Sequence, residues 1–169
     1  GWRPQTDELA EHQACVWFDN RGVGLSVPAG REITVERMAH DALAVMDAAG
    51  LASAHVVGHS LGGLVAQQMA LLARPRVRSL SLLCTFPGGP FVAPLTARMA
   101  WWGLRTRAGT RAMRRHGFLR LVLPPALTPD AALVAHVSEL FGHDLADQPP
   151  VAAAQLRALR ATDLTARLP

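Results

Sequence analysis

Three short apolar runs in the first half of the chain predict β-strands. They cover residues 15–18, 54–57 and 77–84, and each is rich in residues that favour strands and bounded by turn or helix signals. Near-continuous apolar strands are typical of a parallel sheet that is covered on both faces. We therefore expect helices on both sides of these strands.

Two helices are predicted between the strands. Over residues 35–49 apolar side chains recur at steps of three and four, with Thr34 as a cap and Gly50 as a stop. Residues 61–73 are apolar nearly all round, and Pro75 ends that segment. The order strand, helix, strand, helix, strand predicts an α/β fold, here a partial doubly wound parallel sheet of three strands.

The pattern changes after Phe86, where prolines and glycines interrupt the chain and no further strand is convincing. The spacing of apolar residues then predicts helices over residues 94–115, 118–123, 129–141 and 150–160. An all-helical block that follows a parallel strand is typical of a lid. We expect a partial α/β core at 1–86, a helical cap or lid at 87–163, and the start of a return to the core at 164–169.

Composition excludes several classes of protein. With 169 residues, 50% of them hydrophobic and 18% charged, the chain can bury a core and is not disordered. No apolar run is long enough to cross a membrane. Cys15 and Cys84 lack the spacing of a zinc site, the histidines show no pairing that suggests a metal, and we expect Cys84 to be a buried apolar side chain.

The net charge of +4 does not indicate a nucleic-acid partner. Every basic residue is arginine, which reflects a codon bias as much as a function. The densest arginine patch has irregular spacing and no interleaved aromatic residues, so we expect a solvated helix face, made of Arg105, Arg107, Arg111, Arg114 and Arg115.

The candidate catalytic residues form a G-x-S-x-G motif, Gly58-His59-Ser60-Leu61-Gly62. It lies immediately after one predicted strand and before the next helix. A strand that turns into a helix at one residue strains that residue's backbone, and glycines at 58 and 62 remove side chains that would collide. The hydroxyl of Ser60 is then held at a helix N-terminus, where the N–H of Leu61 can stabilise an oxyanion.

Residues 56–63 and 18–26 together resemble the α/β-hydrolase fold superfamily, in its lid-bearing serine esterase and lactonase branch. The resemblance implies that Ser60 is the nucleophile, that the N–H of Leu61 is one oxyanion donor, and that Gly58, His59 and Gly62 complete the nucleophile elbow. It implies no cofactor, a small-molecule acyl substrate, and a mainly scaffolding role for the loop at 19–24. A serine at position 60 argues against haloalkane dehalogenases and epoxide hydrolases.

The rest of the family's triad has no convincing candidate in these residues. The family order is serine, then an acid, then histidine, and we expect the acid, the histidine and the second oxyanion donor to lie outside this internal fragment. His136 and His143, with Asp130, Asp144 and Asp147, follow the triad order but are expected on a solvated surface.

We therefore expect a serine hydrolase that cleaves an ester, lactone or related acyl bond through an acyl-enzyme on Ser60, with the fragment inactive alone. Alternatives are an acyltransferase or cofactor-free haloperoxidase of the same fold, or a non-catalytic ligand-binding protein. Met99, Trp101 and Trp102 are expected to line an apolar pocket or else to pack the cap. No export signal can be recognised, and a cytoplasmic location is expected.

Overall fold

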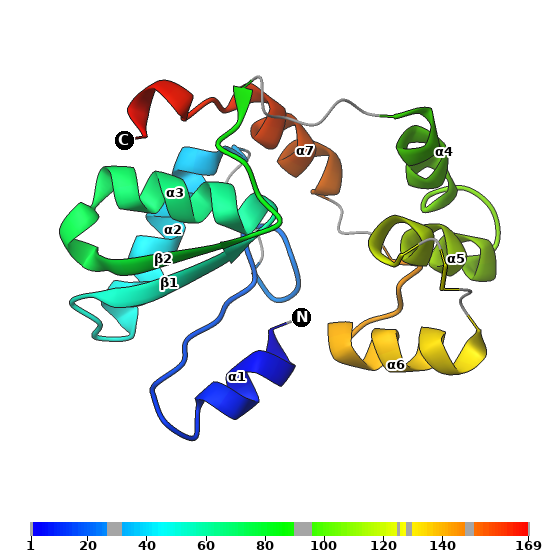
Figure 1. The fold of residues 1–169 in the computed structure, drawn as a ribbon, viewed down its shortest axis with the longest axis horizontal. Coiled ribbons are helices and arrows are strands. Elements are labelled where there is room, and N and C mark those ends of the chain that lie inside the picture. The colour runs from blue at the N-terminus through cyan, green and yellow to red at the C-terminus, as the bar shows by residue number, and fades with distance from the viewer. Residues whose placement is uncertain are drawn as a thin grey trace. The chain divides into compact units, whose positions relative to one another are not determined.

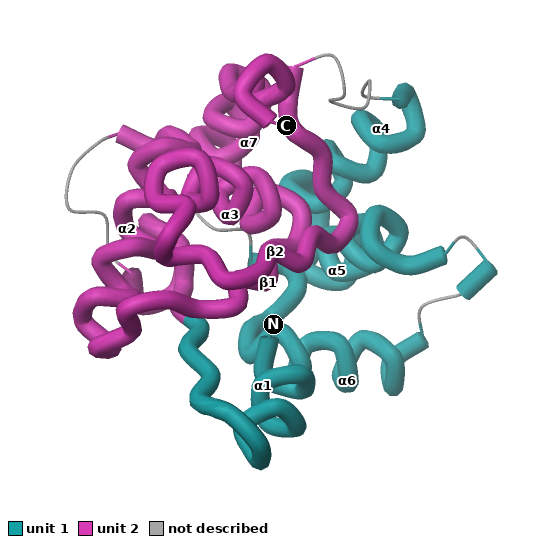
Figure 2. Tube along the Cα trace, turned by 60° about the vertical axis from the view of Figure 1, so that its left-hand side comes forward, with its two compact units in different colours: residues 1–17, 94–148 teal, residues 18–93, 149–169 magenta. Residues whose placement is uncertain are grey.

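The structure of the protein is a computed structural model that describes residues 2–26, 32–89, 96–124, 126–127, 130–147 and 151–168. The chain divides into two compact units, shown in different colours in Figure 2. The sheet unit contains residues 18–93 and 149–169, and the helical unit contains residues 1–17 and 94–148. The last predicted helix of the cap thus groups with the sheet, and the N-terminal segment groups with the helices.

The sheet unit is built on two parallel strands joined by a helix. Strand β1 (Ala54–His59) pairs in parallel with β2 (Val77–Leu83), with Val56 opposite Leu80 and His59 opposite Leu83. Helix α3 (Leu61–Leu72) connects them through the short 3-10 helix η1 (Arg74–Arg76) and runs along the strand pair in Figure 1. This βαβ unit confirms the α/β arrangement expected from the apolar pattern.

The core of the sheet unit lies between α3 and α2 (Val35–Ala48). Thr34 caps α2 by accepting a hydrogen bond from the N–H of Arg37 at 3.1 Å, and Gly50 follows the helix with φ of 67°. Each fully buried Leu, Val or Met contributes about 1.5–3 kcal/mol. The side chains of the two helices that form this core are Val35, Met38, Ala39, Ala42, Met46, Leu64, Val65 and Met69.

The C-terminal residues complete this core. Helix α7 (Ala152–Ala161) contributes the buried Ala158, and Leu164 is buried just before the 3-10 helix η3 (Thr165–Arg167). An isolated antiparallel bridge joins Gly88 to Asp163, and the N–H of Leu164 donates to the carbonyl of Pro87 at 2.9 Å. The segment after β2 therefore lies beside the segment after α7.

The expectation of a third strand at 15–18 is wrong. The only sheet among the described residues has two strands, and residues 15–18 have no regular structure. An apolar run becomes a strand only when a neighbour supplies the ladder hydrogen bonds, and this run pairs with none of the described residues. Its side chains at Val16, Trp17 and Phe18 are exposed accordingly.

The expectation of a sheet covered on both faces is also wrong for the described residues. In β1 the side chains of Ala54 and Val56 pack on the helical core, whereas those of His55, Val57 and His59 are exposed. Since side chains alternate along a strand, the helices α2 and α3 cover the same single face.

The helical unit contains four helices within the described ranges, namely α1 (Arg3–Leu9), α4 (Ala97–Arg105), α5 (Arg111–Val122) and α6 (Ala131–Phe141). A single helix over 94–115 was expected, but the chain breaks between α4 and α5. Gly109 adopts φ of 95°, and Thr110 caps α5 by accepting from the N–H of Met113 at 3.3 Å. The left-handed glycine prevents the helix from continuing, and the threonine caps the start of α5.

A small second core holds the helical unit together. It is formed by Leu119 of α5, Val137 of α6 and Leu145, with Phe118 packed against it. The ring of Phe118 meets Phe141 edge-on at a centroid distance of 5.5 Å. No helix of the described residues is both long enough and apolar enough to cross a membrane.

Candidate functional site: a strained serine between β1 and α3

Ser60 occupies the single residue between the end of β1 and the start of α3, and its backbone is strained. Its φ of 53° and ψ of −121° lie in a region that residues with side chains rarely adopt. Such a conformation costs about 1–3 kcal/mol and persists only where the surroundings enforce it. The sharp turn expected from the motif is therefore present.

Hydrogen bonds to the backbone of Ser60 hold this conformation. Its N–H donates to the carbonyl of Leu83 at 2.9 Å, which extends the β1–β2 ladder by one residue. Its carbonyl accepts from the N–H of Gly63 at 2.9 Å and from the hydroxyl of Thr85 at 2.7 Å. The peptide groups on both sides of Ser60 are thus fixed by α3 and by the end of β2.

The side chain of Ser60 is not used in this structural role. The residue is exposed, and although it stands at the N-cap position of α3, its hydroxyl forms no capping hydrogen bond. N-cap serines ordinarily accept a bond from the helix backbone. The hydroxyl of this exposed residue is thus left without a capping role in α3.

The two glycines that permit the turn are Gly58 and Gly63. A Cβ at Gly58 would lie 2.5 Å from the carbonyl oxygen of Gly62, and one at Gly63 would lie 2.5 Å from a side-chain carbon of Thr85. A Cβ at Gly62 would meet no described atom within 4 Å. The expectation that Gly62 prevents a collision is therefore wrong for the described residues, because a Cβ at that position would face open space.

The backbone N–H groups at the start of α3 follow Ser60 directly in the chain. The first four N–H groups of a helix have no intrahelical acceptor. Those of Gly63 and Leu64 donate to the Ser60 carbonyl, at 2.9 and 3.3 Å. The N–H of Leu61 does not take part in that contact, and it sits at the positive end of the α3 dipole.

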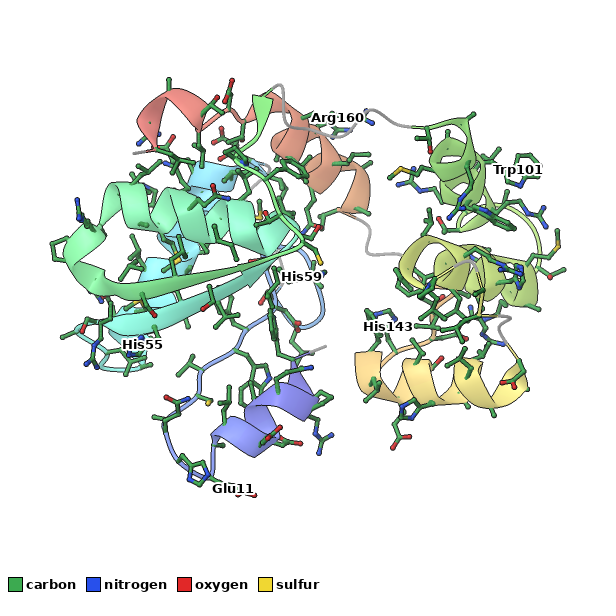
Figure 3. All side chains as sticks on the ribbon, viewed as in Figure 1. Glu11, His55, His59, Trp101, His143 and Arg160 are labelled. Carbon is green, nitrogen blue, oxygen red and sulfur yellow. The ribbon has the colours of Figure 1, made fainter. Side chains whose placement is uncertain are left out.

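His59, the last residue of β1, is exposed and projects from the sheet face opposite α3, as Figure 3 shows. Its side chain therefore belongs to the surface beside the elbow and not to the packing beneath it.

A buried glutamine, missed in the sequence, braces the elbow from below. Gln67 is 3% exposed, and its side-chain amide donates to the carbonyls of Gly63 and Phe86, both at 3.2 Å. It thus links the first turn of α3 to the segment that follows β2. The available signal was Gln67-Gln68, a polar pair inside an otherwise apolar helix.

Cys84 was expected to be buried, but it is exposed. It is also the second described residue other than glycine with a positive φ, at 48°. Because it follows the last residue of β2 as Ser60 follows the last residue of β1, both strands end in a forced turn.

The loop at 19–24 is held by its own charged groups. Arg21 donates to both carboxylate oxygens of Asp41 on α2, at 2.8 and 2.5 Å, and this hydrogen bonding raises the pKa of Arg21. Asp19 accepts from the N–H of Leu25 at 3.4 Å.

With this geometry in place, comparison with known proteins gives the family. A family model described as the α/β hydrolase fold matches residues 1–115. The chain belongs to the α/β hydrolase fold family. It is 35% identical to the "putative carbamate hydrolase RutD" of Variovorax paradoxus over 99% of this chain and 63% of that relative. The protein of the same name from Azorhizobium caulinodans is 42% identical over 48% of this chain and 31% of the relative.

Solved structures of hydrolases have the same fold. A hydrolase from Pseudomonas aeruginosa superposes with a TM-score of 0.74 at 28% identity, over 98% of this chain and 61% of that one. The enol-lactonase of Burkholderia xenovorans gives a TM-score of 0.66 at 25% identity, over 96% and 60%. The chain thus spans less than two thirds of the length of each of these hydrolases.

Two carboxylates of the helical unit of this α/β hydrolase, Asp144 and Asp147, are paired with arginines. Asp144 accepts from Arg111 at 2.7 Å and from Arg115, and Arg111 also donates to Asp147 at 2.9 Å. The Arg115 guanidinium, with the N–H of Ala146 and Arg111, holds the pKa of Asp144 far below its usual range. Two of the five arginines of the patch, Arg111 and Arg115, are therefore paired with carboxylates while their side chains stay partly exposed.

The other residues of this unit that follow the triad order have separate positions and contacts. Asp130 caps α6 by accepting from the N–H of Leu133 at 2.8 Å. His143 forms a contact of 2.9 Å between its Nδ1 and the carbonyl of Asp144. His136 is exposed on α6.

Of the three residues expected to line a pocket, one lines a pocket and two are exposed. Trp102 lines a pocket of about 170 Å³ together with Arg98, His116 and Arg120. Trp101 is 55% exposed and projects from α4 (Figure 3), with the Arg105 guanidinium 5.9 Å from its ring centroid. Met99 is exposed. Among the described residues no group of three or more His, Cys, Asp or Glu side chains has the arrangement of a metal site.

Proposed function

We propose that the protein is a serine hydrolase in which Ser60 attacks the carbonyl carbon of an ester, lactone or related acyl compound. The observation that carries this proposal is the strained, exposed Ser60 at the N-terminus of α3, with φ of 53° and no capping bond. A purely structural serine would gain from capping the helix. A strained backbone at a residue whose side chain is exposed is typical of functional positions.

The chemistry follows from the neighbouring groups. The hydroxyl oxygen of Ser60 forms a bond to the acyl carbon while a base takes its proton, and the carbonyl oxygen becomes negative. The N–H of Leu61 and the dipole of α3 stabilise that charge. The leaving group departs with a proton, and water then attacks the acyl-serine to release the acid and regenerate Ser60.

The base and its carboxylate partner are proposed to lie in sequence beyond these 169 residues. The chain spans 63% of the Variovorax relative, and the imidazoles of the helical unit contribute to packing or lie on its surface. An unassisted serine hydroxyl is a poor nucleophile, so the 169 residues alone are expected to be inactive. Extension of the reading frame is expected to reveal a histidine downstream, and its absence would reject this mechanism.

The names of the relatives suggest the substrate class. Carbamate hydrolysis and enol-lactone hydrolysis, named for two of them, both proceed by attack at an acyl carbon bonded to a heteroatom. We propose a small substrate of this kind, with no cofactor.

Labelling of the complete protein with a fluorophosphonate tests the proposal, because this probe reacts with activated serines. Ser60 is expected to be modified, and Ser60→Ala is expected to abolish labelling, whereas Ser81→Ala on the exposed face of β2 is the matched control. An unlabelled Ser60 would favour a non-catalytic ligand-binding protein.

An acyltransferase or a haloperoxidase of the same fold would also be labelled. The acyltransferase alternative has support in a 42% identical stretch of 82 residues in the acetyltransferase component of an acetoin-cleaving system from Cupriavidus necator. Assays that compare hydrolysis with transfer to added alcohols, and with halide oxidation by peroxide, separate the three activities.

A further inference from the structure

A small pocket between α4 and α5 in the helical unit is lined by cations and aromatic rings. Its four lining residues are Arg98 and Trp102 of α4 and His116 and Arg120 of α5. Each pair is separated by four positions, so each helix presents two neighbouring side chains on one face. The pocket is thus built from two facing pairs, each with one guanidinium and one aromatic ring.

The charge of the pocket is positive. No carboxylate is among its lining residues. Residues 96–147 contain seven arginines and four carboxylates, and Asp144 and Asp147 are taken up by Arg111 and Arg115. Arg98 forms no ion pair with any carboxylate of the described residues. Over residues 96–147 the arginines therefore outnumber the carboxylates by three.

The aromatic residues of the pocket are packed against each other. The ring of His116 lies 5.6 Å from that of Trp102, at an interplanar angle of 57°. The Nε2 atom of His116 accepts from the Nε of Arg120 at 3.4 Å. The guanidinium of Arg120 also donates to the carbonyl of Leu127 at 3.4 Å. The ring of His116 thus lies against Trp102 and contacts Arg120.

We infer that this pocket binds the carboxylate of a small planar anion. A guanidinium fork matches the geometry of a carboxylate, and an indole face favours a flat unsaturated group next to it. A volume of about 170 Å³ admits a carboxylate with its attached ring or double bond. The inference concerns only the helical unit and does not depend on the role of Ser60.

Titration of the full chain with benzoate, acetate and inorganic phosphate, followed by calorimetry, tests the inference. Benzoate is expected to bind most tightly, with an affinity that falls as salt is added. Arg98→Gln and Arg120→Gln are each expected to weaken benzoate binding about tenfold or more, because each removes a charged donor. Arg105→Gln is the matched control, since Arg105 lies on α4 but contacts Trp101.

A Trp102→Leu variant separates recognition of the ring from recognition of the charge. It is expected to weaken benzoate more than acetate, while circular dichroism shows that the helices are intact. The inference is overturned if wild-type protein does not bind benzoate at millimolar concentration, if phosphate binds more tightly, or if Arg105→Gln weakens binding as much as Arg98→Gln.

Discussion

The hydroxyl of Thr85 donates a 2.7 Å hydrogen bond to the carbonyl oxygen of Ser60. The methyl group of the same threonine lies where a side chain at Gly63 would be. Thr85 thus holds both the carbonyl of the strained residue and the first turn of α3, although it is 25 positions away in the sequence.

Replacement of Thr85 by valine tests this contact. Valine keeps the shape of the side chain but removes the donor, so a loss of about 1 kcal/mol is expected, or about 2–4 °C in melting temperature. Fluorophosphonate labelling of Ser60 in the complete protein should also slow. Thr85→Ser, which keeps the hydroxyl, is the control. Wild-type stability and labelling in Thr85→Val would show that the bond does not support the elbow.

Two alanine substitutions at elbow glycines should change the free energy of unfolding in opposite directions. Gly58→Ala places a Cβ 2.5 Å from a backbone oxygen and is expected to cost about 3 kcal/mol or more. Gly62→Ala meets no described atom and should stabilise α3 by about 0.5–1 kcal/mol, because alanine favours helix. Chemical denaturation of both variants measures the difference. Equal destabilisation by the two substitutions would contradict the geometry described for the turn.

The strain at Ser60 predicts that its loss stabilises the protein. Ser60→Gly relieves a conformation that costs about 1–3 kcal/mol, offset in part by the greater backbone entropy of glycine. A net gain of about 1 kcal/mol is expected, together with complete loss of labelling. Ser60→Ala loses labelling without relief of strain. A melting temperature for Ser60→Gly at or below that of Ser60→Ala would argue against the strain.

The ion pairs of Asp144 predict a pH dependence of stability. Its two arginine partners and the N–H of Ala146 lower its pKa in the folded state from an ordinary value of 3.8. The stabilisation is therefore fully present above about pH 4 and is lost as the pH falls below that value, because the unfolded state binds the proton first. Between pH 7 and pH 2 the melting temperature of Asp144→Asn should fall less steeply at the acid end than that of the wild-type protein. Glu139→Gln, at an exposed carboxylate of α6, should retain the wild-type slope.

The features that depend on neighbouring residues could be predicted from the sequence. Thr34 and Gly50 mark the ends of α2, and the motif around Ser60 predicts the sharp turn with its strained serine, because these effects act over one or two residues. Gly109 and Thr110 are likewise a stop and a cap between α4 and α5. The prediction of one helix over 94–115 rests on the apolar spacing and does not use them.

The features that depend on distant residues could not be predicted in this way. Residues 15–18 have the composition of a strand, but whether they form one depends on a partner elsewhere in the chain. Gln67 and Thr85 brace the elbow across 19 and 25 positions, and nothing in their immediate sequence specifies those acceptors. Asp144 likewise finds Arg115 across 29 positions.

The bridge between Gly88 and Asp163 ties the segment after β2 to the segment after α7 within the sheet unit. The N–H of Leu164 and the carbonyl of Pro87 join the same two segments at 2.9 Å. This contact fixes the spacing of Gly88 and Asp163 independently of the length of the chain between them. A change in length of the intervening chain is thus compatible with an unchanged strand pair and an unchanged turn at Ser60.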